Sequence, residues 1–98
     1  MTNKIKIADL PEFDMAEHIK TEADIAAYLN IVLEEGDASE LAHALGIIAR
    51  AKGMADIAQK SGITREALYK ALRPNAHPRF DTVNKVMHAM GVKLHASV

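Results

Sequence analysis

Cysteine is absent from this chain of 98 residues, and its absence excludes several kinds of chemistry at once. The chain has no disulfide, no thiol nucleophile and no thiolate ligand for a metal, which suits a reducing cytoplasm. Long apolar runs are also missing, because the longest stretch, residues 41–49, is interrupted by His43 and is too short to cross a bilayer. The first residues include two lysines but no apolar signal core. We therefore expect a cytoplasmic protein with no membrane association.

Aromatic residues are scarce, since tryptophan is absent and aromatic residues make up only 4% of the chain. The core must therefore consist of Ala, Leu, Ile, Val and Met, a set that favours helices packed closely through small side chains. A chain of this length forms one domain with a modest core. We expect an all-α fold.

Catalytic and metal-binding patterns are missing as well. The five histidines are dispersed, and no two have the i, i+4 spacing of a helical metal site. The chain has neither a Ser-His-Asp pattern nor a glycine-rich phosphate loop. We therefore expect no enzyme activity, no metal and no cofactor.

The charges that are present are segregated along the chain. Residues 1–40 carry ten acids against three lysines, a net charge of −7, and residues 41–98 carry nine bases against three acids, a net charge of +6. A basic region suits the phosphate backbone of a nucleic acid. The acidic region would be repelled by DNA and suits either a basic protein partner or a solvated surface.

The first half of the chain contains an arm and two predicted helices. Residues 1–20 form an N-terminal arm, in which Ile5 and Ile7 alternate with lysines and are typical of a short strand. A single helical domain then covers residues 21–98. Its first helix begins at Thr21 and ends at Gly36, with residues 25, 28, 29, 32 and 33 as the buried stripe. Asp37 with Glu40 caps the second helix, which ends at Gly53.

The second half contains three more predicted helices, so the fold has five. Two short helices, 54–60 and 64–72, are followed by a loop over residues 73–81 with two prolines. The last helix begins at Phe80 or Asp81 and ends at Gly91. Val92, Leu94 and Ala96 then alternate with polar residues, which predicts a short C-terminal strand. A lone strand is unstable, so it should pair with residues 5–7 or with the same strand of a second subunit.

Residues 54–72, MADIAQKSGITREALYKAL, carry the most informative pattern in the chain. Gly62 accepts a positive φ at the turn, and a small residue at Ala58 lets the second helix cross close to the first. Ile63, Leu68 and Leu72 provide the buried side of the second helix. This pattern is typical of a helix-turn-helix, in which the second helix lies in the DNA major groove.

The outward-facing residues of this segment are the candidate DNA contacts. Thr64 caps the second helix or contacts a phosphate, and Arg65 can donate two hydrogen bonds to a guanine. Glu66 could accept from a cytosine amine, or it could only orient the side chain of Arg65 or Lys70. The alternative is that these side chains form only a solvated helix face. The full predicted set is Thr64, Arg65, Glu66, Tyr69, Lys70, Arg73 and Arg79.

Two stretches, GITREALYKAL and PRFDTV, are similar to the Cro/C1-type (XRE) helix-turn-helix domain of phage repressors, which has the lambda-repressor-like fold. Together with IAAYLN upstream, they make residues 13–96 resemble the HigA-like addiction module antidotes. The resemblance implies base-reading roles for Arg65, Glu66 and Lys70, with contacts from Thr64 and Tyr69 beside them. It also implies that Arg79 approaches the minor groove or the backbone. The loop RPNAHPRF is longer here than in the phage repressors.

The family resemblance implies two roles for the chain. Such antitoxins neutralise a small basic RelE/HigB-like toxin by binding it, and as homodimers they repress their own operon at a palindromic operator. Two alternatives fit the same residues: a phage-type regulator without a toxin, and a protein-interaction module that has lost DNA binding.

Overall fold

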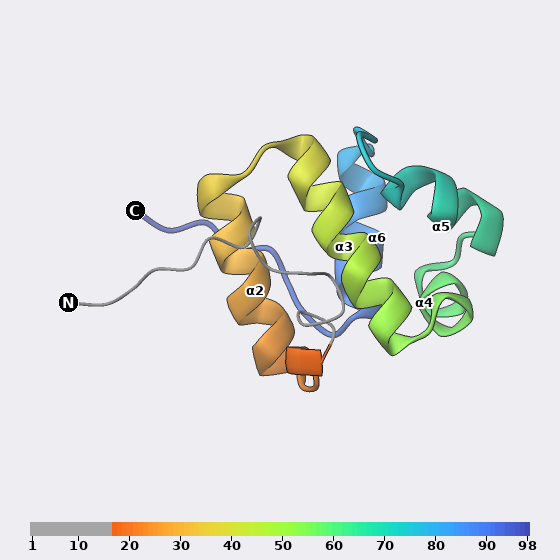
Figure 1. Cartoon of the computed structure of the whole chain (residues 1–98), viewed down its shortest axis with the longest axis horizontal. Coiled ribbons are helices and arrows are strands. Elements are labelled where there is room, and N and C mark those ends of the chain that lie inside the picture. Colours follow the sequence, from red (N-terminus) through yellow and green to blue (C-terminus); the bar gives the residue numbers. More distant parts are fainter. Residues whose placement is uncertain (1–16) are drawn as a thin grey trace.

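The computed structural model describes residues 17–98, and these residues form five helices around a single core (Figure 1). The all-α prediction and the number of helices are confirmed for this part of the chain, while the strand predicted at residues 5–7 lies outside it. The helices are α2 (Glu22–Glu35), α3 (Ala38–Lys52), α4 (Met54–Ser61), α5 (Arg65–Leu72) and α6 (Phe80–Ala89).

Helix α2 begins with the capping box that the sequence predicts. The backbone N–H of Asp24 donates to Thr21 Oγ1 over 3.1 Å, and the N–H groups of Lys20 and Thr21 each donate to Asp24 Oδ2 over 3.0 Å. The two backbone hydrogen bonds stabilise the charged carboxylate and hold the pKa of Asp24 below its usual value.

The buried stripe of α2 is shorter than predicted. Ile25, Leu29 and Val32 are buried, but Leu33 is 44% exposed. Each residue of a helix turns about 100°. Val32 therefore belongs to the buried stripe, whereas Leu33, the next residue, lies at its edge.

Helix α3 is the central element of the fold. Asp37 caps it by accepting a hydrogen bond from the N–H of Glu40 over 3.0 Å, which lowers the pKa of the Asp37 carboxyl. Every residue from 44 to 49 is buried, so the middle of the helix is enclosed on all sides rather than along one stripe, while its last residues, 50–52, are exposed. The helix contacts α2, α4 and α5.

Helices α4 and α5 meet at the turn that Gly62 makes. Gly62 has φ 77°, and its N–H donates to the Ala58 carbonyl over 3.0 Å. Ala58 is buried where the two helices pack, and Leu68 and Leu72 bury one side of α5. The Ser61 hydroxyl is also buried, but it donates to the Ile57 carbonyl over 2.7 Å and so keeps a partner. The two short helices, the positive φ of Gly62 and the buried side of α5 are therefore as predicted.

The C-terminal strand prediction is wrong. Residues 92–98 form no strand and no helix. Val92 is buried and Leu94 is packed against the core, whereas Lys93 and His95 are exposed. Side chains of an extended segment point alternately toward the core and toward solvent, whether or not the segment pairs with a strand. Alternating apolar and polar residues therefore indicate which side chains are buried, but not that a strand is present.

Helices α2 and α5 lie on opposite sides of α3, as Figure 1 shows along the longest dimension of the molecule. The acidic N-terminal helix and the helix that bears Arg65 and Lys70 are therefore far apart. Within residues 17–98, no helix is both long enough and apolar enough to span a bilayer.

Candidate nucleic-acid interface

Helix α5 is held firmly on one side and open on the other. Thr64 has an extended backbone and caps the helix, because its Oγ1 accepts a hydrogen bond from the N–H of Ala67 over 3.0 Å. Leu68 is 0% exposed and Leu72 is 2% exposed, so the buried side is fixed in the core. A rigid helix of this kind can present its outer side chains in a defined geometry.

The outer side of α5 carries the residues that the sequence predicts. Arg65, Glu66, Tyr69 and Lys70 are all exposed. Arg65 and Tyr69 are one helical turn apart, and the Arg65 guanidinium carbon lies 5.9 Å from the centre of the Tyr69 ring. A guanidinium over a tyrosine ring is held by cation–π attraction and keeps its N–H donors free to bind. Sequence reasoning missed this contact, although the i, i+4 spacing could have indicated it.

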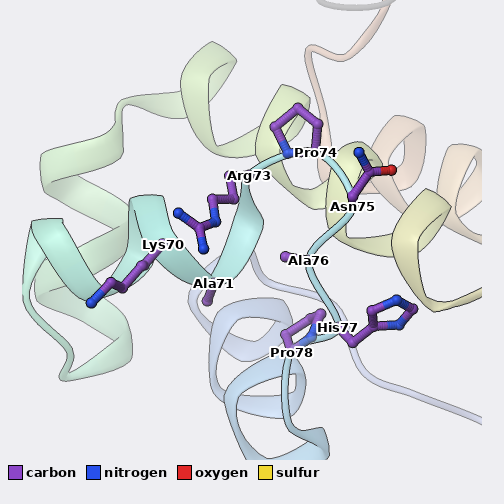
Figure 2. A pocket seen from close by; sticks show the side chains of 8 residues that line it. All are labelled: Lys70, Ala71, Arg73, Pro74, Asn75, Ala76, His77 and Pro78. Carbon is purple, nitrogen blue, oxygen red and sulfur yellow. The ribbon is translucent and has the colours of Figure 1, made fainter.

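The loop after α5 forms a shallow pocket with the end of the helix. The pocket has a volume of about 460 Å³ and is lined by Lys70, Ala71, Arg73, Pro74, Asn75, Ala76, His77 and Pro78. Figure 2 shows that Lys70 and Arg73 extend to one side, and that Asn75 and His77 point to the other. The loop therefore adds Arg73 to the cationic side of α5 but does not bring His77 to it.

Arg79 lies at the far end of this loop, where it precedes α6. Its side chain is 86% exposed, and Arg79 Nε lies 3.4 Å from Asp81 Oδ1. Because the side chain is so exposed, water screens the ion pair with Asp81 and weakens it. The Arg79 guanidinium therefore remains accessible to a ligand. Phe80 beside it is 71% exposed, a feature that the sequence analysis did not single out.

The structure therefore brings six of the seven predicted residues onto one helix and its following loop, from Thr64 to Arg73. It places Arg79 six residues further on, at the start of α6. The cationic side chains of Arg65, Lys70, Arg73 and Arg79 are all exposed. The chemistry available at this surface is hydrogen bonding and charge attraction toward an anion. Contact with DNA stays a prediction.

Comparison with known proteins agrees with the antidote resemblance. The family model described as "Probable addiction module antidote protein" matches residues 9–98. An uncharacterized protein of Haemophilus influenzae is 48% identical over 84 residues, which cover 86% of this chain and 87% of that protein. No solved structure matches. The family match spans nearly the whole chain, and the chain therefore belongs to the family of probable addiction module antidote proteins.

Proposed function

We propose that this protein is the antitoxin of a type II toxin–antitoxin module. In this proposal it neutralises a RelE/HigB-like toxin by direct binding and represses its own operon by sequence-specific DNA binding. It acts in the cytoplasm and by binding alone, without catalysis. An antidote family implies a toxin as partner, and this membership supports the first role.

The exposed side of α5 is the observation that carries the second role. Helices α4 and α5 act as a helix-turn-helix of the lambda-repressor type, with α5 in the major groove. Arg65, held over Tyr69, reads a guanine through a bidentate hydrogen bond. Lys70 and Glu66 contact neighbouring bases, Arg73 and Arg79 bind phosphates, and Thr64 completes the contact.

A homodimer is the form that suits this role. A protein with two-fold symmetry places two α5 helices on a palindromic operator, with half-sites about 34 Å apart or a multiple of that distance. A phage-type regulator without a toxin would use the same α5 surface. The family match favours the antitoxin because that match concerns antidotes and extends to residue 9, well into the acidic region.

Alanine substitution of the two arginines tests DNA binding with the duplex upstream of the protein's own gene. Arg65→Ala should lose about 1–3 kcal/mol, roughly 5- to 150-fold in affinity, and should relax the preference for one base pair. Arg79→Ala should weaken operator and unrelated duplex alike and should lower the salt dependence of binding.

Lys93→Ala is the matched control, because it also removes one exposed positive charge but lies in the C-terminal segment. It should bind as the wild type does in fluorescence anisotropy at two salt concentrations. Wild-type affinity in both arginine variants would show that α5 is not the recognition helix.

A further inference from the structure

Helix α2 has an outer face that carries small and apolar residues instead of the usual charges. Ala23, Ala27 and Ile31 recur every four residues, so they lie one above another on one face of the helix. All three are exposed, and Ile31 keeps 40% of its surface accessible. Exposed helix faces are normally covered by lysine, arginine and glutamate, so this stripe is unusual.

Every charged residue from Thr21 to Glu40 is an acid. Residues 21–40 contain six acids and no base. Within residues 17–98, Glu34, Glu35 and Glu40 have no ion-pair partner, because the ion pairs there join Lys60 to Asp56 and Arg79 to Asp81. The face therefore has an apolar centre and, at its C-terminal end, Glu34 and Glu35 without ion-pair partners among residues 17–98.

These acids decide which partner fits. A second copy of the chain would bring Glu34 and Glu35 against the same acids or against Glu22 and Asp24, whichever way the two helices ran. Like charges across an interface oppose association. A nucleic acid would be repelled in the same way. A basic protein meets opposite charge at these acids and apolar surface at the centre, with alanines that allow close approach.

We propose that the outer face of α2, centred on Ala27 and Ile31, is the docking surface for a small basic partner protein. This inference rests on the proposed function, in which that partner is the toxin. Helix α2 lies on the side of α3 away from α5 (Figure 1). The proposal gives the acidic region a role in protein binding, for which the cationic surface of α5 is unsuited.

Two substitutions test this surface, with the purified product of the gene adjoining that of this chain as the probe. Ala27→Arg adds bulk and a like charge at the centre of the stripe, and Ile31→Ser removes its largest apolar side chain. Each should weaken binding of the probe at least tenfold by calorimetry. Ala51→Arg is the matched control, an exposed alanine in the last turn of α3, and should bind as the wild type does.

Helical circular dichroism and operator affinity should stay at wild-type values in all three variants, which separates a lost interface from a lost fold. Wild-type affinity for the probe in Ala27→Arg and Ile31→Ser would overturn the assignment while leaving the toxin role intact. A change of oligomeric state in Ala27→Arg by light scattering would also overturn it, because the face would then belong to a second copy. If the wild-type chain itself fails to bind the probe, the proposed toxin role fails with it.

Discussion

Replacement of Gly46 by valine should destabilise the protein, although valine is the better helix former of the two. Gly46 lies in the middle of α3, where a Cβ atom would be only 3.0 Å from the carbonyl oxygen of Leu72 and 3.7 Å from its Cβ. The obstacle at 3.0 Å is backbone at the end of α5, which cannot rotate away as a flexible side chain would. The absence of a side chain at Gly46 therefore sets how closely α5 lies on α3.

Two opposing effects give the magnitude. At an open helical site, valine in place of glycine would gain a few tenths of a kcal/mol. Extra carbon atoms in a packed contact cost about 1–3 kcal/mol. The net expectation is a loss of about 1–2 kcal/mol, or roughly 4–16 °C in the melting temperature of a domain of this size.

Urea and thermal unfolding followed by circular dichroism measure this loss. Ala51→Val is the control, because it places valine at an exposed position of the same helix and should change stability by well under 1 kcal/mol. The sign alone decides the outcome. A Gly46→Val protein as stable as the wild type, or more stable, would refute the close packing of α5 on α3.

Two further predictions concern the helix caps. Thr64→Ala should cost about 1 kcal/mol in thermal unfolding because the N–H of Ala67 loses its acceptor, and Thr64→Ser should restore most of the loss; equal melting of all three proteins would mean that the cap has no role. The hydrogen bond from the N–H of Glu40 lowers the pKa of Asp37 in the folded protein. The charged Asp37 therefore stabilises the fold fully above the unfolded pKa of 3.8, and this stabilisation is lost as the pH falls through the lower folded pKa. The melting-temperature difference between wild type and Asp37→Asn should therefore shrink in acid, and a constant difference from pH 6 to pH 2 would contradict this.

Helix boundaries were the most predictable part of the fold, because each depends on a few neighbouring residues. Thr21 and Asp37 mark the starts of α2 and α3, and Gly36 and Gly53 follow their last residues. Capping hydrogen bonds join residues three apart in the chain, so the sequence alone contains the information they need.

Features that depend on packing between distant segments were predicted less well. The alternation at residues 92–96 indicated correctly that Val92 and Leu94 face the core, but Ala96 is exposed, and the pattern cannot reveal whether a neighbouring strand exists. Helical periodicity could not reveal that neighbouring elements enclose residues 44–49 of α3 completely. The number of elements around a helix is a property of the whole fold.

The candidate interface divides in the same way. The exposure of Arg65 and Lys70 and the capping role of Thr64 follow from helical periodicity and were predictable. The pocket beside Arg73 could not be predicted, because it depends on the path of a loop through Pro74 and Pro78. The left-handed backbone of Asn75, with φ 68°, helps to turn that loop.

The enclosed helix α3 has a consequence for how two ligands could influence each other. It lies between α2 and α5, the helices that carry the two proposed binding surfaces, and contacts both of them. A coupling free energy between them could be carried by the shared core, in which Ile47 and Ile48 of α3 are buried. The rigidity of a single helix would thereby set whether the two equilibria are linked or independent.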